Sequence, residues 1–180
     1  ANALAAAGVG VALGLAPDAI VDGLEAARPA KGRSVWRRAG GAAILDDTYN
    51  ASPASLRAAL ETFPGPGAGG GAGGRRVVVL GDMLELGPLA ESAHREAGQA
   101  VAAAGASEFI GMGTLAALAV EAAREAGLAE SHHTRTFEDT VALLLKRLGP
   151  GDRVLVKGSR GMRMERVVDA LMARLGGDDG

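Results

Sequence analysis

The chain has 180 residues, of which 48% are hydrophobic, and a formal net charge of −2, which is enough for one main domain with a core of mostly small aliphatic side chains. Basic and acidic residues are interspersed, and this pattern argues against a charged face that binds nucleic acid or an anionic membrane surface. The absence of cysteine excludes disulfides, thiolate metal sites and a cysteine nucleophile, and it favours a reducing, cytoplasmic location.

The first 27 residues predict two helices. Residues 2–15 are apolar, Pro17 interrupts them, and a second helix over residues 17–27 carries Ile20, Val21 and Leu24 at helical spacing. The first segment is too short and too interrupted by glycine to span a bilayer, and no basic region precedes it, so we expect a buried helix. The missing initiator methionine and helix cap indicate a segment cut from a longer protein.

A linker and a hairpin follow. Proline and glycine in residues 28–33 break the helical pattern. Residues 34–38 and 42–45 predict two strands, joined at Gly40-Gly41 because both glycines tolerate positive φ. The second strand leads directly into Asp46-Asp47.

Helical and strand patterns then alternate to the end of the chain. The patterns predict helices over residues 54–63, 89–104, 115–125, 137–148 and 164–175, and strands over residues 76–80, 108–110, 132–135 and 153–156. The continuous apolar runs at 77–80 and 154–156 are typical of parallel strands covered by helices on both faces. We therefore expect an α/β fold with a Rossmann-like, doubly wound, mostly parallel sheet, whose ligands gather outside the carboxyl ends of the strands.

Two segments predict little regular structure. The tract PGPGAGGGAGG at residues 64–74 is of low complexity and is expected to be a flexible loop. Residues 177–180 are expected to be a frayed tail.

Several motifs resemble functional sites only weakly. Residues 111–116 fit G-x-G-x-x-A, but the fit follows a middle strand of a glycine-rich chain, so a tight turn is the preferred interpretation. The chain has no Walker A motif. His132 and His133 point to opposite faces if they lie on a strand, and His94 lacks metal-binding partners one helical turn away, so we expect no metal site and a helix-surface or loop-contacting His94.

The segment DDTYNASP at residues 46–53 is more specific. Ser52 and Pro53 are explained as the N-cap and first residue of a helix. Turn and cap chemistry does not explain two adjacent carboxylates with a tyrosine and an asparagine, because adjacent carboxylates repel and each needs donors. A carboxylate facing a sugar diol accepts two hydroxyl hydrogens, which is one role for such a group at a nucleotide site.

Two further polar segments follow predicted strands. They are GDMLELG at residues 81–87 and KGSRGMRME at residues 157–165. In the second, basic side chains beside glycines just before a helix would suit a carboxylate or phosphate. A solvated basic turn explains that segment equally well.

Together these segments resemble one family. The order NALAA (2–6), KGR (31–33), DDTYNASP (46–53), LGDMLELG (80–87) and VKGSRGMRMER (156–166) is similar to the last part of the Mur ligases, most closely the MurF type. The resemblance implies that residues 1–33 are the end of a central ATPase domain and a linker, and residues 34–176 a C-terminal Rossmann-like domain. The glycine-rich tract departs from the family pattern as an insertion.

The resemblance also implies an activity: ATP-dependent addition of D-alanyl-D-alanine to UDP-N-acetylmuramoyl-tripeptide in peptidoglycan synthesis. ATP phosphorylates the tripeptide carboxylate, and the dipeptide amine then attacks the acyl phosphate. The family's phosphate-binding loop and Mg2+ ligands belong to the central domain. We expect the N-terminal domain and most of the central domain to be missing from this sequence, and so we expect no catalytic residue here and no activity from this chain alone. The resemblance assigns ATP binding to Asn2, Arg33 and Asp47, and the dipeptide side to Tyr49, Asn50, Ser52, Asp82, Lys157, Ser159 and Arg160, with Lys157 or Arg160 for its carboxylate.

Other interpretations remain open. Ligases of the MurE type, cyanophycin synthetase and folylpolyglutamate synthase share this kind of domain and would change only the acceptor. The lack of a DNPR-like tetrapeptide after residues 108–110 argues against the MurE type. A stand-alone nucleotide-binding or interaction module is the alternative from a different class.

Overall fold

The chain divides into two units in a computed structural model that describes residues 2–27, 30–63 and 74–178. The first unit covers residues 1–30 and the second residues 31–180. Each unit is described by itself. The glycine-rich tract at 64–73 lies outside the described residues.

The first unit consists of helices α1 (Asn2–Ala12) and α2 (Pro17–Ala26). Gly10 allows them to approach, since a Cβ there would lie 2.9 Å from Cγ1 of Ile20. The prediction of a buried first helix is wrong for this chain, because two helices alone cannot cover each other. Large apolar side chains are exposed at Leu4, Val9, Val11, Leu13, Leu15 and Val21. Within the described part of the chain, no helix has the length and apolar character needed to cross a membrane.

The second unit is built on a seven-stranded sheet with the strand order β5-β4-β3-β6-β2-β1-β7. The four pairs β2–β6, β6–β3, β3–β4 and β4–β5 are parallel, whereas β1 is antiparallel to both of its neighbours. This confirms the predicted doubly wound, mostly parallel α/β class. The strands are β1 (Val35–Ala39), β2 (Ala42–Asp47), β3 (Arg76–Gly81), β4 (Glu108–Met112), β5 (Ser131–Thr134), β6 (Arg153–Lys157) and β7 (Gly177–Asp178).

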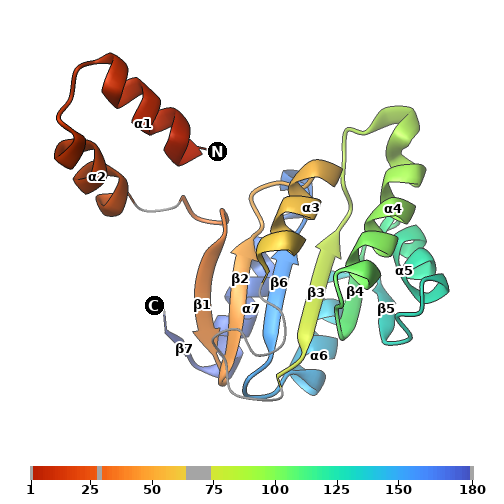
Figure 1. Cartoon of the computed structure of the whole chain (residues 1–180). Helices are drawn as coiled ribbons and strands as arrows, with labels where there is room; N and C mark the ends of the chain where they lie inside the picture. Colours follow the sequence, from red (N-terminus) through yellow and green to blue (C-terminus); the bar gives the residue numbers. More distant parts are fainter. Residues whose placement is uncertain (1, 28–29, 64–73, 179–180) are drawn as a thin grey trace. The chain divides into compact units, whose positions relative to one another are not determined.

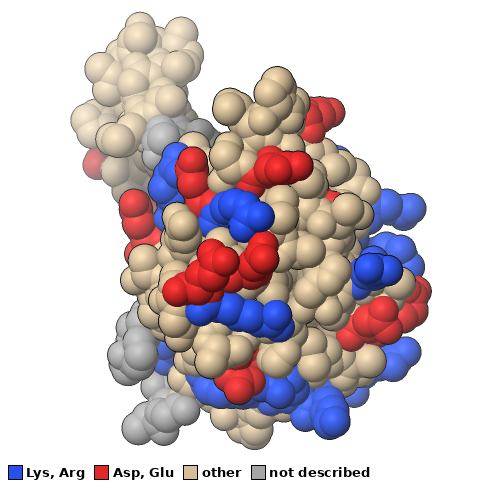
Figure 2. All heavy atoms as spheres, turned by 90° about the vertical axis from the view of Figure 1, so that its right-hand side faces the viewer, with Lys and Arg blue, Asp and Glu red and all other residues tan. Residues whose placement is uncertain are grey.

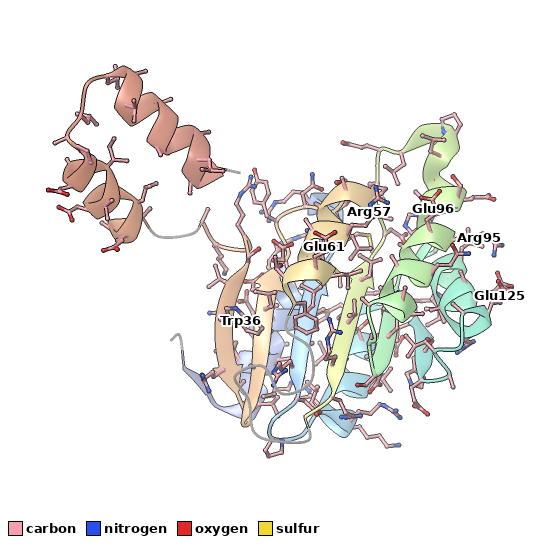
Figure 3. All side chains as sticks on the ribbon, in the orientation of Figure 1. Trp36, Arg57, Glu61, Arg95, Glu96 and Glu125 are labelled. Carbon is pink, nitrogen blue, oxygen red and sulfur yellow. The ribbon has the colours of Figure 1, made fainter. Side chains whose placement is uncertain are left out.

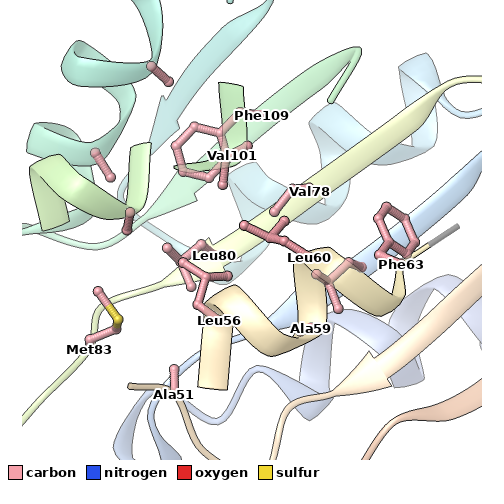
Figure 4. Close-up of a cluster of buried hydrophobic side chains, with 14 of the residues drawn as sticks. Ala51, Leu56, Ala59, Leu60, Phe63, Val78, Leu80, Met83, Val101 and Phe109 are labelled. Carbon is pink, nitrogen blue, oxygen red and sulfur yellow. The ribbon is translucent and has the colours of Figure 1, made fainter. Parts of the chain in front are cut away.

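Helices cover both faces of this sheet (Figure 1). Helices α3 (Pro53–Thr62), α4 (Ala90–Ala103) and α5 (Ala116–Glu125) lie on one face, and α6 (Phe137–Arg147) and α7 (Glu165–Leu175) lie on the other. Short 3-10 turns at Gly87–Leu89 and Arg160–Met162 precede α4 and α7. Successive residues of β3 therefore enter two different cores: Val78 and Leu80 pack with α3 to α5 (Figure 4), and Val77 and Val79 pack with α6 and α7.

The start of α3 follows the predicted capping chemistry. The Ser52 hydroxyl accepts the Ser55 N–H, and the Ser55 hydroxyl accepts the Ser52 N–H, so two free donors of the helix end are satisfied. Pro53 occupies the first turn, where no N–H is needed. At the other end of α3, Phe63 stacks on Trp36 of β1 with 6.3 Å between ring centroids. Figure 3 labels Trp36 on this strand.

The end of the chain differs from the prediction. Residues 177–178 form strand β7 beside β1, with Gly177 opposite Ala39 and Asp178 opposite Arg38, rather than a frayed tail. Gly176 at φ 69° ends α7 and turns the chain back toward the sheet edge. A two-residue strand has no periodicity that a sequence pattern could reveal.

Charged side chains hold the opposite edge of the sheet, where β3 and β6 begin. The Arg75 guanidinium contacts Asp152 at 2.6 Å and Glu108 at 3.1 Å. Burial alone would raise the pKa of Asp152, but hydrogen bonds from Arg75 and from the Gly149 N–H outweigh it and lower that pKa. Hydrogen bonding to Asp152 in turn raises the pKa of Arg75.

Arg76 joins two helix ends at the same edge. Its guanidinium donates to the carbonyl oxygens of Phe63 and Ala104, which follow α3 and α4. These carbonyls have no partner within their helices, so the arginine acts as a shared C-terminal cap. Burial, with the nearby charge of Arg153 as a second cause, lowers the pKa of Arg76.

The remaining charges are spread over the surface. Figure 2 shows basic and acidic side chains interspersed on the face that carries α4 and α5, with no large area of one sign. Arg95 and Glu121 form an ion pair between these two helices at 3.0 Å.

We predict that Gly98→Ala destabilises the domain. Alanine normally gains about 1 kcal/mol over glycine inside a helix, but a Cβ at Gly98 would lie 1.9 Å from the Ala119 carbonyl oxygen of α5. The resulting separation of α4 and α5 should cost about 1–3 kcal/mol net in urea unfolding. Gly23→Ala, in a helix where a Cβ meets nothing within 4 Å, is the matched control and should leave stability unchanged or raise it.

A second prediction concerns acid stability. Because the folded-state pKa of Asp152 is lowered, its contribution is complete above the ordinary aspartate value of about 3.9 and is lost as the pH falls through the folded value. Asp152→Asn should therefore cost about 1–3 kcal/mol near pH 7, and the difference from wild type should shrink below about pH 4. A constant difference from pH 7 to pH 3 in urea titrations would contradict this role.

Candidate functional site

A pocket of about 530 Å³ opens at the carboxyl ends of β2 and β6. Its walls come from the linker, from the end of β2, from the loop that follows it, from one side of α3 and from the end of β6. This is the edge at which the sequence predicted ligand binding. The lining residues include Arg33, Ser34, Asp47, Tyr49, Asn50, Ser52 and Lys157.

The floor of the pocket is a buried ion pair between Asp47 and Lys157. The two residues are Cα partners at the ends of the parallel strands β2 and β6, and Lys157 Nζ lies 2.5 Å from Asp47 Oδ2. The side chains are only 15% and 3% exposed, respectively. Lys157 Nζ also donates to the Asn50 carbonyl oxygen at 2.9 Å, so the pair fixes the loop after β2.

The two adjacent carboxylates have different roles. Asp46 is buried, and its Oδ1 accepts from the Thr48 hydroxyl at 2.6 Å and from the Thr48 N–H at 3.3 Å. That carboxylate shapes the turn. Alternation along the strand turns Asp47 the other way, into the pocket.

The linker packs tightly against the loop after β2. The Gly32 carbonyl accepts the Tyr49 N–H at 2.8 Å. Gly32 has φ 75°, and a Cβ there would lie 2.9 Å from the Thr48 hydroxyl, so only glycine fits without strain. Next to it, Ser34 donates both its N–H and its hydroxyl to Asp47 Oδ1, at 3.1 and 3.2 Å.

Two arginines flank the exposed Tyr49. The Arg33 guanidinium lies 3.8 Å from the ring centroid and that of Arg160 lies 6.0 Å from it. Both distances are within the range of cation–π attraction. Tyr49 and Arg33 line the pocket, whereas Arg160 lines a neighbouring hollow that also includes Tyr49.

Asp82 caps a helix. Its Oδ2 accepts the Thr114 N–H at 3.0 Å and its Oδ1 accepts the Ala116 N–H at 2.7 Å, at the start of α5. Gly113 takes φ 121° to make room for this carboxylate. The glycine motif at 111–116 is therefore a turn closed by a side chain of the protein itself, in the position where a dinucleotide site would hold phosphate.

Ser159 ties three loops together. Its hydroxyl accepts the Leu84 N–H at 2.8 Å and donates to the Ala51 carbonyl at 3.4 Å, and its N–H donates to the Asp82 carbonyl at 3.1 Å. The loops after β2, β3 and β6 are thereby held in one arrangement.

His94, on α4, holds the loop after β3 through a hydrogen bond from Met83. The ring is 0% exposed; Nε2 accepts the Met83 N–H at 2.9 Å and Nδ1 lies 2.6 Å from the Ala90 carbonyl. These partners require hydrogen on Nδ1 and a lone pair on Nε2. His94 is loop-contacting, as predicted, but it is not on the helix surface, because α4 packs this side against the sheet.

The predicted site residues thus fall into two groups. Tyr49, at 43% exposure, and Arg160, whose side chain is 66% exposed, are accessible to a ligand. Asp82, Lys157 and Ser159 are buried and hold the loops, and Ser52 caps α3. Asn2 begins α1 in the other unit, and its side chain lies outside the described residues.

Sequence reasoning missed Ser34, the burial of His94 and the Asp46 turn. No local pattern marks the hydrogen bonds of Ser34 and His94, because their partners are 13 and 11 positions away. Over the residues with described positions, no group of three or more His, Asp or Glu side chains could hold a metal ion.

Comparisons with known proteins identify the family to which this chain belongs. The sequence profile of the "Mur ligase, glutamate ligase domain" matches residues 32–160. The UDP-N-acetylmuramoyl-tripeptide–D-alanyl-D-alanine ligase of Bacillus subtilis strain 168 is 33% identical over 177 residues, which are 95% of this chain and 37% of that protein.

Solved structures of MurF proteins are also similar to this chain. A crystal structure of MurF from Acinetobacter baumannii is 31% identical with a TM-score of 0.82, over 96% of this chain and 37% of that one. MurF from Thermotoga maritima in complex with ADP is 30% identical with a TM-score of 0.70, over 93% and 36%. The chain therefore spans little more than a third of the length of these relatives.

We predict that His94→Phe destabilises the domain by about 1–3 kcal/mol, because the Met83 N–H loses its acceptor inside the protein. His94→Gln, whose side-chain oxygen is able to accept that hydrogen, should recover part of the loss. Urea unfolding gives the stabilities, and hydrogen exchange at the Met83 amide reports the bond directly. Equal exchange rates in the Phe variant and in wild type would rule out this role.

Proposed function

Because this chain belongs to the Mur ligase family, we propose that it is the C-terminal part of an ATP-dependent ligase of the MurF type. The whole enzyme would join D-alanyl-D-alanine to UDP-N-acetylmuramoyl-tripeptide in the cytoplasm, as a step of peptidoglycan precursor synthesis. The observation that carries this proposal is the pocket at the ends of β2 and β6, which brings together three of the five family segments. Arg33, Asp47, Tyr49, Asn50 and Lys157 line it, and Ser159 bonds to Ala51 in its wall.

We place the nucleotide at the linker side of the pocket. The Asp47 carboxylate is suited to accept hydroxyl hydrogens of ribose, and the exposed Arg33 guanidinium is suited to phosphate oxygens. By the family resemblance, Asn2, at the start of α1, is assigned to the adenine side of ATP.

We place D-alanyl-D-alanine on the side of Tyr49, Asn50, Ser52 and Arg160. Arg160 is the better partner for the dipeptide carboxylate, because its ion pair with Glu165 is long at 3.5 Å and its side chain is 66% exposed. The charge of Lys157 is already balanced by Asp47. Asp82 and Ser159 serve this side by fixing its loops.

The reaction forms an amide through an acyl phosphate, and this chain's residues would contribute by binding and positioning. The described residues do not offer a carboxylate cluster that fits Mg2+. By the family resemblance we assign Mg2+ and the phosphate-binding loop to the central domain of the whole enzyme, and we expect this chain by itself to lack ligase activity.

The test is phosphate release by the full-length ligase with ATP and UDP-N-acetylmuramoyl-tripeptide. D-alanyl-D-alanine should support turnover and diaminopimelate should not. Turnover with diaminopimelate, or with glutamate and a folate, would show that the acceptor is not D-alanyl-D-alanine. The chain would then belong to another type of ligase in this family. Tight ATP binding by this chain without any response to D-alanyl-D-alanine would favour a stand-alone nucleotide module.

We predict that Arg160→Gln in the full-length ligase raises the KM for D-alanyl-D-alanine roughly tenfold or more and leaves the KM for ATP nearly unchanged. The reason is loss of one charge-assisted hydrogen bond to the carboxylate, worth about 1.5–3 kcal/mol. Arg166→Gln is the control, because Arg166 lies 4.3 Å over the ring of Phe137, away from the pocket. A KM for the dipeptide that is the same in both variants would exclude Arg160 from the carboxylate site.

A further inference from the structure

A second hollow lies between the last turns of α3 and α4, toward the edge of the sheet where β3 begins. Its walls come from α3, from the start of β3 and from the end of α4, and its volume is about 500 Å³. None of its lining residues lines the pocket at the ends of β2 and β6. The two hollows are therefore separate, and they lie on different sides of α3.

A buried cation lines this second hollow. Arg76 is 6% exposed, and its guanidinium donates one N–H each to the carbonyl oxygens of Phe63 and Ala104. Of the five N–H groups of an arginine, three remain without an acceptor among the residues with described positions, and the buried Nε–H is one of them. Donors left unused in a buried group are costly.

Arg76 also forms no ion pair with a carboxylate within the described part of the chain, whereas its neighbour Arg75 pairs with Asp152 and Glu108. The tract at 64–73, which precedes β3, contains no acidic residue. Burial lowers the pKa of Arg76, as expected of a cation that is removed from water without a carboxylate beside it. An anion from outside the chain would offset this cost.

The other walls are mostly apolar and are built from small side chains. Leu60 and the ring of Phe63 contribute from α3 and the residue after it, and Ala100, Ala103 and Ala104 contribute from the end of α4. Alanine at these wall positions leaves a space that larger side chains would fill. A hollow of this size, with apolar walls and one buried charged group, is suited to a small organic ligand.

Two exposed charges of α3 complete the lining. Arg57 and Glu61 lie one helical turn apart, as labelled in Figure 3, and neither forms an ion pair among the described residues. Their opposite charges cancel, so the net charge of the lining is that of Arg76. A monoanion would balance this charge, whereas a phosphate dianion would bring a surplus negative charge into mostly apolar surroundings.

We propose that this hollow binds a small organic carboxylate that carries an apolar body. The carboxylate would accept two N–H groups of Arg76 in the fork geometry of arginine–carboxylate pairs. The apolar body would lie against Phe63 and the alanines of α4. This inference goes beyond the proposed function and does not depend on it, because the two hollows share no residue.

The test uses phenylacetate as the probe and two reporters that the chain already carries. Trp36, the single tryptophan, stacks on Phe63, so its fluorescence should change as the hollow fills. The Nε–H signal of Arg76 in NMR spectra reports the cation directly. Phenylacetate should bind saturably and shift both signals. Acetate lacks the apolar body and phenylacetamide lacks the charge, so each should bind at least about tenfold more weakly.

Ala103→Leu tests the place of binding without changing Arg76. The larger side chain would occupy the hollow, and the dissociation constant for phenylacetate should rise at least about tenfold. Ala54→Leu is the matched control, because Ala54 is an exposed alanine in the first turn of α3 that does not line the hollow. This control should bind phenylacetate like wild type.

Arg76→Lys tests the cation itself. Lysine keeps the charge but loses the fork, so phenylacetate binding should weaken about fivefold or more. Since Arg76 also caps α3 and α4, urea unfolding must show that this variant is folded under the conditions of the titration. If it is not folded, Ala103→Leu and its control decide the question alone.

The inference would be overturned by any of four results: no saturable binding of phenylacetate to wild type, equal binding of acetate, equal binding of phenylacetamide, or unchanged binding in Ala103→Leu. Ligase activity is not measured in this experiment. A negative result therefore leaves the proposed function standing.

Discussion

The candidate site depends on the ion pair between Asp47 and Lys157. A lysine that is 3% exposed is costly to bury without a counter-charge, and Asp47 supplies that charge from the neighbouring strand. The pairing requires that β2 and β6 run in parallel and in a register that ends both strands at the same level. The doubly wound topology thus brings two segments that are distant in the sequence together as an ion pair at the base of the pocket. Lys157 of this pair also holds the loop after β2, because it donates to the Asn50 carbonyl.

Around this pair, most polar residues that resemble ligand-binding groups are used to join loops. Asp82 closes the start of α5, Ser159 connects the loops after β2, β3 and β6, and His94 holds Met83. Each of these buried groups has its hydrogen bonds satisfied within the protein, which is the condition for a rigid platform. The groups left for recognition are Arg33, Ser34 and Tyr49 in the pocket wall and Arg160 on the other side of Tyr49.

The linker has a structural role as well as a connecting one. Residues 31–34 begin the second unit directly after the division at residue 30, and they are held to the loop after β2 by Gly32 and Ser34. Arg33 and Ser34 are therefore at once the start of this unit and a wall of the pocket.

The sequence by itself determined the fold class, the edge of the sheet that carries the site and the cap of α3, because continuous apolar strands, helical periodicity and capping residues are local signals. It also marked Arg33 and Asp47 through the family segments, although their roles remain proposals. Only the tertiary structure decided that Asp46 shapes the turn while Asp47 meets Lys157, that Ser34 holds Asp47, that His94 is buried and that residues 177–178 form a strand. These outcomes depend on strand register and helix packing between segments up to about 140 positions apart, and no local pattern of residues contains that information.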